Sequence, residues 1–227
     1  MTDNRNKIGK KSKILIVDDH PIFRFGIIRL INREKDMEIC GETDNPEDTF
    51  KLIKDLNPDL IIADISLKDT SGLELIKEVT AKYKNLPVLV LSMHDESIYA
   101  ERVLRLGAKG YIMKEVAYES VINAIHLVLE GKIYVSEKIS EDFINKYVDG
   151  SGETQQPPIN SLTDRELEIF KLIGMGYATK QISAELCLSI NTINTYKDKI
   201  KNKLKLKNAH ELMQQAVFWA SIDAGKI

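Results

Sequence analysis

The 227-residue sequence has only two cysteines, Cys40 and Cys187, and they lie far apart in the chain. Neither belongs to a CxxC pair or has a histidine at metal-ligand spacing. This scarcity argues against a disulfide framework and against a structural zinc site. We therefore expect two reduced structural thiols in a cytoplasmic protein.

Long hydrophobic runs are missing as well. No apolar stretch approaches the roughly 20 residues that a membrane-spanning helix needs, so we expect no membrane segment. The basic stretch before Ile14 lacks the apolar core of a signal peptide, which again favours the cytoplasm. Aromatic residues make up only 7% of the chain, and its 43% hydrophobic and 29% charged residues are typical of a globular protein.

The formal net charge of −2 conceals an uneven distribution. Residues 159–227 carry ten Lys and Arg against seven Asp and Glu, so the acidic excess lies before them. Six lysines and one aspartate fall within residues 190–207. An acidic front and a locally basic back indicate two domains with different tasks, and the chain is long enough for two hydrophobic cores.

The first 131 residues alternate between short apolar runs and amphipathic stretches. Such runs predict buried strands of a parallel sheet, and the stretches between them predict helices that cover both faces. The expected strands are Ile14–Val17, Met37–Gly41, Asp59–Ala63, Pro87–Leu91 and Lys109–Met113, and the expected helices cover residues 20–33, 46–56, 71–82, 96–106 and 116–130. The pattern predicts an α/β class, flavodoxin-like, doubly wound five-stranded parallel sheet with strand order 2-1-3-4-5.

The remaining 96 positions lack strand patterns. A helix is expected to begin near Ser136 and to run to residue 148, and the polar stretch DGSGETQQPPIN that follows predicts a flexible linker. Thr163 and Glu166 form a capping box that opens the next helix. Further helices over about 180–186, 190–205 and 208–221 complete an all-α four-helix domain with a helix-turn-helix arrangement.

Polar residues stand at the ends of the predicted strands. Asp18 and Asp19 follow the first strand and Asp64 follows the third, and the carboxyl ends of neighbouring parallel strands meet at one edge of the sheet. Gathered carboxylates favour a hard cation such as Mg²⁺. Ser92 ends the fourth strand and Lys114 follows the fifth, which completes a set suited to phosphoryl transfer with Asp64 as the nucleophile. One such aspartate alone would more often be a helix cap, so the joint placement carries the prediction.

The motifs ILIVDDH, IIAD, VLS and KGYIMK, in this order, resemble the receiver domain of bacterial response regulators. The resemblance implies that a histidine kinase phosphorylates Asp64 and that Ser92 and Lys114 contact the phosphoryl group. The implied Mg²⁺ ligands are Asp18, Asp19, Asp64 and the backbone carbonyl of Ser66. Tyr111 matches the aromatic switch that turns inward when Ser92 moves, although it could also be a half-buried packing residue.

Three neighbours of these motifs have less definite roles. His20 is expected to have a structural polar role rather than to be a ligand. His94 and Ser66 match positions that tune the lifetime of the phosphoryl group, but they could equally be exposed loop residues. The loop after Asp64 reads Leu67-Lys68-Asp69 where the family usually has Met-Pro-Gly, a difference that should loosen it without removing a ligand.

The helix expected over residues 190–205 has two faces. At 100° per residue, the apolar face carries Ile190, Ile193, Ile200 and Leu204. The polar face could offer amide contacts to base edges and lysines to phosphates, or could simply be a solvated lysine-rich surface. Asp198 lies on this face too, where it could accept a hydrogen bond from cytosine or reduce nonspecific affinity for DNA.

Residues 160–220 resemble the LuxR-type helix-turn-helix at the C-terminus of NarL/FixJ-family regulators, on the motif LTDRELEIFKLIGMGYATKQISAELCLSINTINTYKDKIKNKLKLKN. The resemblance implies binding to double-stranded DNA. The expected DNA contacts are Asn191, Asn194, Thr195, Tyr196, Lys197, Lys199, Lys201 and Lys205. The last helix carries Leu212, Met213, Val217 and Trp219, which would pack on the domain, form a dimer contact, or do both.

The combined prediction is a two-component response regulator and not an enzyme. Its receiver domain would cover residues 12–131, a linker helix and flexible linker residues 132–160, and the DNA-binding domain residues 161–227. The expected partners are a histidine kinase, DNA, a second copy of the chain and RNA polymerase, and the expected cofactor is Mg²⁺. Two rivals are a phosphatase with an aspartate nucleophile and a DNA-binding scaffold that is independent of phosphorylation.

Overall fold

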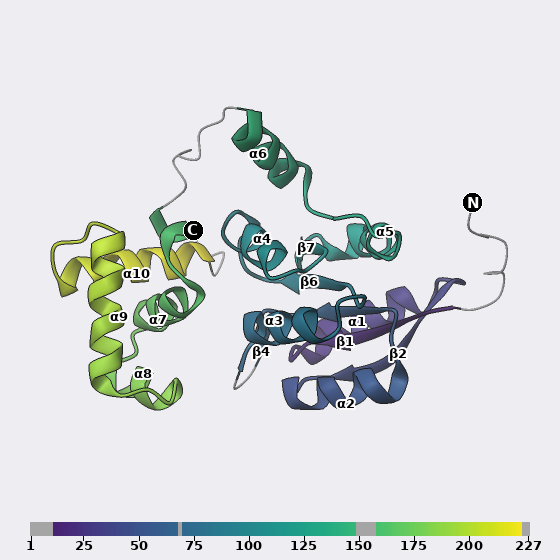
Figure 1. Ribbon diagram of the computed structural model, residues 1–227, viewed down its shortest axis with the longest axis horizontal. Helices are drawn as coiled ribbons and strands as arrows, with labels where there is room; N and C mark the ends of the chain where they lie inside the picture. The colour runs from purple at the N-terminus through teal and green to yellow at the C-terminus, as the bar shows by residue number, and fades with distance from the viewer. Residues whose placement is uncertain (1–10, 68–69, 149–157, 224–227) are drawn as a thin grey trace. The chain divides into compact units, whose positions relative to one another are not determined.

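The computed structural model describes residues 11–67, 70–148 and 158–223. The chain divides into two compact units, residues 1–142 and 143–227, and each is described by itself below (Figure 1). No helix in the described ranges is both long and apolar enough to cross a membrane.

The first unit is built on a five-stranded parallel sheet. Its strands are β1 (Ser12–Val17), β2 (Met37–Thr43), β3 (Leu60–Ala63), β6 (Val88–Ser92) and β7 (Gly110–Met113). They lie in the order β2-β1-β3-β6-β7, so the predicted doubly wound order is confirmed. The second strand runs two residues beyond the prediction because its register with β1 shifts between Ile14 and Leu15, a bulge that lets pairing continue to Thr43.

Helices cover both faces of this sheet, as Figure 1 shows. They are α1 (Pro21–Ile31), α2 (Pro46–Leu56), α3 (Gly72–Lys82), α4 (Glu96–Arg105) and α5 (Ala117–Leu129). Side chains of a strand alternate between its faces. Ile14, Ile16 and Leu89 accordingly join residues of α1 and α5 in one continuous buried core. Every strand side chain from Ile14 to Val17 is fully buried, which explains the absence of polar alternation in the sequence.

The loop after Asp64 contains a small hairpin that the sequence pattern did not predict. Its strands are β4 (Ser66–Leu67) and β5 (Thr70–Ser71), and they pair in the antiparallel direction. Two-residue strands are too short to show a periodicity. Lys68 and Asp69, on which the expected loosening of this loop rests, lie outside the described residues.

The start of the predicted linker packs on the edge of the sheet. Tyr134 forms a parallel bridge with Gly110 of β7, and its N–H donates to the carbonyl of Lys109 at 2.9 Å. Ser136, just before α6 (Glu137–Val148), donates to a carboxylate oxygen of Glu96 at 2.8 Å. The first residues after α5 are therefore held by β7 and α4. The proposed domain boundaries at residues 131 and 160 stay predictions.

The second unit is helical. After a 3-10 turn (Pro158–Ser161) come α7 (Asp164–Gly174), α8 (Thr179–Glu185), α9 (Ile190–Lys203) and α10 (Ala209–Asp223). The predicted capping box is present, with Thr163 accepting from the Glu166 N–H and Glu166 accepting from the Thr163 N–H. The predicted fold class, an α/β receiver-type unit followed by an all-α unit, is confirmed.

Two details of α9 differ from the prediction. The helix ends at Lys203 rather than at residue 205, because Lys205 adopts a left-handed conformation with φ of 55° that ends the helical hydrogen bonding. Ile190, expected in the core, is 46% exposed because it is the first residue of the helix and lies before its buried turn. Ile193 and Ile200 are fully buried as predicted.

Candidate functional site

The sheet register brings Asp18 and Asp64 together. Asp64 follows β3, and its N–H donates to the carbonyl of Val17, the last residue of β1. Asp18 comes next after Val17 and donates from its own N–H to Thr43. Both carboxylates are almost fully buried, at 2% exposure for Asp18 and 1% for Asp64. Two buried carboxylates at the ends of neighbouring strands require a compensating cation.

Lys114 supplies a positive charge between the two carboxylates. Its Nζ lies 2.7 Å from Oδ2 of Asp18 and 2.7 Å from Oδ2 of Asp64, and the side chain is only 2% exposed. Burial raises the pKa of Asp64, and the nearby ammonium group of Lys114 opposes that rise. The residue predicted to neutralise charge is therefore placed directly at the predicted nucleophile.

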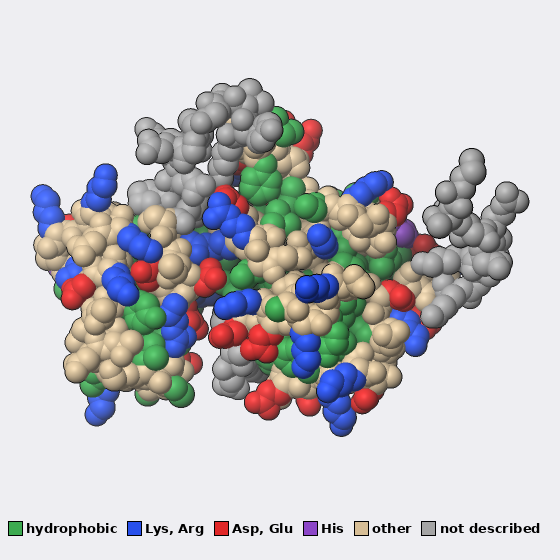
Figure 2. Space-filling view, viewed as in Figure 1, with side chains coloured by type: hydrophobic (Ala, Val, Ile, Leu, Met, Phe, Trp, Pro, Cys, Tyr) green, Lys and Arg blue, Asp and Glu red, His purple; other side chains and the backbone are tan. Residues whose placement is uncertain are grey.

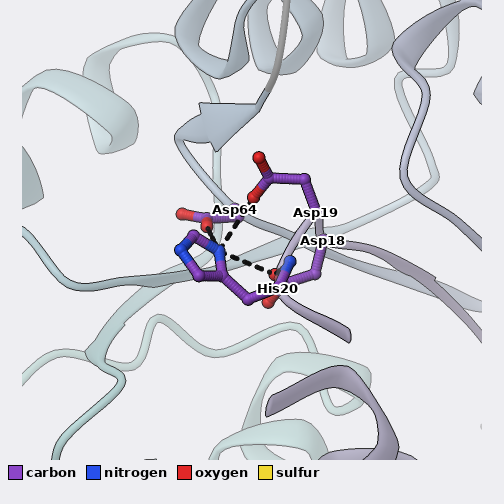
Figure 3. Close-up of side chains that lie close together, drawn as sticks. All are labelled: Asp18, Asp19, His20 and Asp64. Carbon is purple, nitrogen blue, oxygen red and sulfur yellow. Dashed lines mark hydrogen bonds and ion pairs between the residues drawn. The ribbon is translucent and has the colours of Figure 1, made fainter. Parts of the chain in front are cut away.

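His20 lies inside the acidic cluster (Figure 3). Its Nδ1 is 2.8 Å from Oδ1 of Asp19, 3.3 Å from Asp18 and 3.4 Å from Asp64, and half of its side chain is exposed. Candidate ligand atoms of these four residues all fall within 4.8 Å of one another. Sequence reasoning assigned His20 only a structural role. Its position directly after the Asp18-Asp19 pair was the available signal for its place in the cluster.

The donor set of this cluster fits a hard divalent cation. Asp18, Asp19 and Asp64 offer carboxylate oxygens, the ligand type that Mg²⁺ prefers. Among the described residues no hydrogen bond reaches the buried Oδ1 of Asp19, although the His20 ring stands nearby. A metal ion at that oxygen would take the place of its contact with the His20 ring.

Ser92 and Tyr111 both contact the backbone of His94. Ser92 ends β6, is fully buried, and its Oγ accepts a hydrogen bond from the N–H of His94 at 3.2 Å. Tyr111 is 1% exposed, and its hydroxyl donates to the carbonyl of His94 at 2.7 Å. Tyr111 is therefore fully buried rather than half-buried, and its role as a switch stays a prediction.

The structure places His94 and Ser66 in contact with each other. Oγ of Ser66 lies 2.7 Å from Nε2 of His94, and the Ser66 N–H donates to Oδ1 of Asp64 at 3.0 Å. The alternative that His94 is an exposed loop residue is wrong, because its exposure is only 7%. The two residues are 28 positions apart, so no local sequence signal could have paired them.

In the helical unit, Asn191, Asn194 and Thr195 are exposed on α9, as predicted for DNA contacts. Lys199 is exposed as well, with its Nζ 5.6 Å from the centre of the Tyr196 ring. Lys205 is exposed but lies beyond the end of the helix. Figure 2 shows Lys and Arg side chains protruding at several places on this unit.

Two of the predicted DNA-binding lysines already have partners within the unit. Nζ of Lys197 donates to Oγ1 of Thr179 in α8 at 2.6 Å, and burial lowers the pKa of Lys197. Nζ of Lys201 lies 2.8 Å from the carboxylate of Asp198. Lys197 therefore helps hold α8 against α9, a role that the helical-wheel pattern did not predict.

Comparisons with known proteins agree with both halves of this description. Residues 14–126 match the family of response regulator receiver domains, and residues 160–216 match the luxR family of bacterial regulatory proteins. The oxygen regulatory protein NreC of Staphylococcus carnosus (strain TM300) is 34% identical over 209 residues, which cover 90% of this chain and 96% of NreC. The transcriptional regulatory protein DegU of Brevibacillus brevis is 30% identical over 227 residues, which cover 94% of each chain.

A solved structure with the same fold is the RcsB response regulator of Salmonella typhimurium. It matches with a TM-score of 0.70 and 23% identity, over 92% of this chain and 98% of that chain. The sheet order, the acidic cluster at the ends of β1 and β3, and the two family matches all point the same way. The chain belongs to the NarL/FixJ family of response regulators, in which a receiver domain precedes a LuxR-type helix-turn-helix DNA-binding domain.

Proposed function

We propose that a histidine kinase phosphorylates Asp64 and that the phosphoryl group controls sequence-specific DNA binding, and hence transcription. The observation that carries this proposal is the placement of Asp64, buried at a strand end with the Lys114 ammonium 2.7 Å from its Oδ2. An aspartate so placed has a cationic group ready for the charge of a phosphoryl group.

In the proposed reaction, a carboxylate oxygen of Asp64 forms a bond to the phosphorus of a phosphohistidine. The phosphorus–nitrogen bond of the donor breaks, and the released imidazole takes up a proton. Asp18, Asp19, Asp64 and the backbone carbonyl of Ser66 would hold Mg²⁺, which supplies positive charge to the phosphoryl oxygens when bound. Lys114 orients the attacking carboxylate and neutralises charge beside it.

Ser92 and Tyr111 form the proposed switch. The hydroxyl of Ser92 would donate to a phosphoryl oxygen, and the inward position of Tyr111 would be favoured in the same state. The phosphoryl group thereby biases a two-state equilibrium of the receiver domain, which alters its surface and releases the DNA-binding domain to act.

For DNA binding, we propose that α9 enters the major groove. The proposed contacts remain Asn191, Asn194, Thr195, Tyr196, Lys197, Lys199, Lys201 and Lys205. Lys197 and Lys201 must release Thr179 and Asp198 before their ammonium groups reach phosphates. The RcsB protein of Salmonella enterica serovar Typhimurium has been solved bound to the promoter rprA, which supports this role by analogy.

We further propose that the chain binds DNA as a homodimer through α10. Leu212 and Trp219 are buried within the unit, whereas Met213, Val217 and Phe218 are exposed by 50%, 46% and 58%. Part of the helix therefore serves the core and part is available to a second copy. RcsB has been solved as two dimers bound to two DNAs, which is consistent with this arrangement. RNA polymerase is a proposed further partner at the promoter.

The proposal is tested by incubating the full chain with acetyl phosphate and Mg²⁺. We expect an alkali-labile phosphoryl adduct on the wild type and none on Asp64→Asn. An adduct that survives this substitution, or none on the wild type, would contradict the proposal. Sustained turnover of a generic phosphate ester would instead support the phosphatase, and unchanged DNA affinity after phosphorylation would support the phosphorylation-independent scaffold.

A further inference from the structure

We propose that Arg24 is a positioning residue that sets the orientation of two carboxylates of the acidic cluster, those of Asp18 and Asp19. The proposal rests on the binding of Mg²⁺ and the phosphorylation of Asp64 proposed above, and it names a further residue for that reaction. Its basis is a hydrogen bond from the Arg24 guanidinium to the peptide group that joins the two aspartates. Glu42, on a strand of the sheet, holds the guanidinium in place.

Arg24 lies in the first turn of α1, directly after the loop that carries the aspartates. Its N–H donates to the carbonyl of His20 at 2.9 Å, the first hydrogen bond of the helix. Side chains of a helix lean toward its N-terminus, so a long side chain in the first turn reaches back to the preceding loop. Nη1 of Arg24 accordingly donates to the backbone carbonyl of Asp18. The side chain is only 17% exposed, which limits the competition of water for this bond.

The hydrogen bond from Arg24 acts on both aspartates because a peptide group is planar. The carbonyl of Asp18 and the N–H of Asp19 belong to one plane, and a rotation of this plane changes how the two side chains are oriented relative to each other. The preceding peptide group is held as well, since the Asp18 N–H donates to the carbonyl of Thr43 at 3.0 Å. With both peptide groups held, these carboxylates converge with that of Asp64 in one cluster (Figure 3).

Glu42 keeps the guanidinium in the orientation that this contact needs. Its Oε2 lies 2.6 Å from Nε of Arg24, so the planar fork of donors joins β2 to the loop after β1. Glu42 directly precedes Thr43, which pairs with Val17 in the register that follows the bulge. The side chain of Glu42 is 52% exposed, so water screens the pair, which contributes orientation more than stability.

The positive charge of Arg24 and its hydrogen bond affect Mg²⁺ binding in opposite directions. A guanidinium beside a cation site repels the cation, so removal of the charge by itself would tighten Mg²⁺ binding. Loss of the hydrogen bond would weaken Mg²⁺ binding, because a freed peptide group lets the two carboxylates point apart. Removal of one charge-assisted hydrogen bond corresponds to about a ten-fold change in such an equilibrium.

The test measures Mg²⁺ affinity in the full chain by following backbone amide resonances during a titration with MgCl₂. We expect Arg24→Ala to raise the Mg²⁺ dissociation constant about ten-fold, although this variant has one positive charge fewer. Arg24→Lys, which keeps the charge but not the fork of donors, should raise it less. Glu42→Gln should raise it about three-fold, and the double variant should match Arg24→Ala, because Glu42 acts through Arg24.

A second readout follows the loop in the absence of metal. The N–H of His20 donates to Oδ1 of Asp18 at 2.8 Å, a bond that depends on the orientation of Asp18. Exchange of this N–H with solvent, measured by NMR, should be about ten-fold faster in Arg24→Ala. Arg29→Ala is the matched control, since it removes the same charge from an exposed position of α1 where the guanidinium lies over the Phe25 ring. It should change neither the exchange nor the Mg²⁺ affinity.

The outcomes separate this inference from the proposed function. If the wild type binds Mg²⁺ and is labelled on Asp64, but Arg24→Ala binds Mg²⁺ as tightly or more tightly, the positioning role is refuted while the proposed function stands. A greater loss in the double variant than in Arg24→Ala, or an equal loss in Arg29→Ala, also refutes it. If Arg24→Ala does not fold, wild-type Mg²⁺ affinity in Arg24→Lys and Glu42→Gln refutes it. If the wild type takes no label, the proposed function fails, and exchange of the His20 N–H still decides whether Arg24 holds the loop.

Discussion

At the scale of single residues, burial decides which charges matter. Lys114 and Asp64 are nearly inaccessible, so their attraction is little screened by solvent and neither can be left alone cheaply. Lys132 and Glu130 form a pair of the same length on the surface, where both side chains are about 60% exposed and water screens the attraction. A pair of lysine and carboxylate therefore has unequal consequences at the two places in the first unit.

Replacing Lys114 with Met should destabilise the receiver domain by about 2 kcal/mol, because two buried carboxylates lose their common cation. Lys132→Met should leave stability nearly unchanged, because water screens its exposed pair with Glu130. Urea unfolding followed by circular dichroism at neutral pH measures both. Mg²⁺ should restore part of the stability lost in Lys114→Met. Equal effects of the two variants would contradict a stabilising role of Lys114 between Asp18 and Asp64.

Substitutions at two residues of α9 should affect DNA binding differently, one its sequence specificity and the other its overall affinity. Asn194→Ala should cost about 1–3 kcal/mol of discrimination between a selected site and random DNA, since an amide reads base edges. Lys199→Ala should weaken binding to all sequences alike and reduce the salt slope by about one, since a lysine contacts phosphate. Binding titrations from low to moderate salt distinguish the two patterns. A uniform loss in Asn194→Ala would exclude it from base readout.

At the scale of elements, the residues that cap two helices also contact a neighbouring helix. Ser136 is both the cap of α6, accepting from the Ile139 N–H at 3.2 Å, and a donor to Glu96 of α4. One hydroxyl thus starts a helix and fixes its beginning on the receiver domain. The capping box of α7 is likewise joined to another helix, because Nζ of Lys203 lies 2.6 Å from Glu166.

Ser136→Ala should loosen the start of α6 locally. Loss of a cap typically costs about 1 kcal/mol, which predicts roughly five- to ten-fold faster amide exchange over residues 137–140. Ser120→Ala serves as the control, because that hydroxyl bonds the carbonyl of Val116 in its own helix. Hydrogen exchange with mass spectrometry compares the two. Unchanged exchange in Ser136→Ala would show that packing of Ile139 alone holds this segment.

Glu166 should make the helical unit sensitive to acid. Burial by itself raises the pKa of Glu166, but hydrogen bonds from Lys203 and from Thr163 outweigh it and hold the pKa below its usual 4.5. A lowered folded-state pKa means that the carboxylate stabilises the unit above pH 4.5, and that this stabilisation is lost as the pH falls through the folded-state value.

The measurement uses Trp219, the only tryptophan of the chain, which is buried beside Phe170 and reports on the helical unit alone. Its fluorescence gives the urea concentration at which half of the unit is unfolded. In the wild type this concentration should decrease as the pH is lowered below 4.5. Glu166→Gln should unfold at a lower urea concentration, and that concentration should depend less on pH over the same range. Glu168→Gln, which affects an outward pair with Arg165, should keep the wild-type pH dependence.

At the scale of the whole molecule, two units share one chain and divide sensing from output. The receiver domain carries the acidic cluster, and the helical unit carries the exposed polar face of α9 and the apolar strip of α10. An exposed apolar strip on a helix that also contributes to the core is suited to pairing with its own copy.

Phe218→Asp should therefore prevent dimerisation of the phosphorylated chain. A charge in the centre of an apolar contact opposes association, while the fold of the unit should persist because Phe218 is exposed. Sedimentation of phosphorylated wild type and variant, together with binding to DNA bearing one or two half-sites, checks this. A variant that still sediments as a dimer would place the interface elsewhere.

Much of the molecule could be predicted from local patterns. The apolar runs, the capping box of Thr163 and Glu166, and the polar residues at strand ends depend on neighbours along the chain. Once five strands alternate with helices, general rules of connection leave few strand orders, and in the predicted order Asp18 meets Asp64 at one edge. The sequence by itself therefore determined the fold class, the family and the acidic cluster.

Only the tertiary structure decided which distant side chains meet. His94 reaches Ser66 across 28 positions, Tyr134 completes the edge of β7, and Lys197 bonds Thr179 of the neighbouring helix. Such contacts depend on the exact register of strands and the packing of helices, to which hydrophobic periodicity is blind. No local pattern distinguishes His94 or Tyr134 from other loop residues. Only the folded sheet brings His94 to Ser66 and Tyr134 to Tyr111.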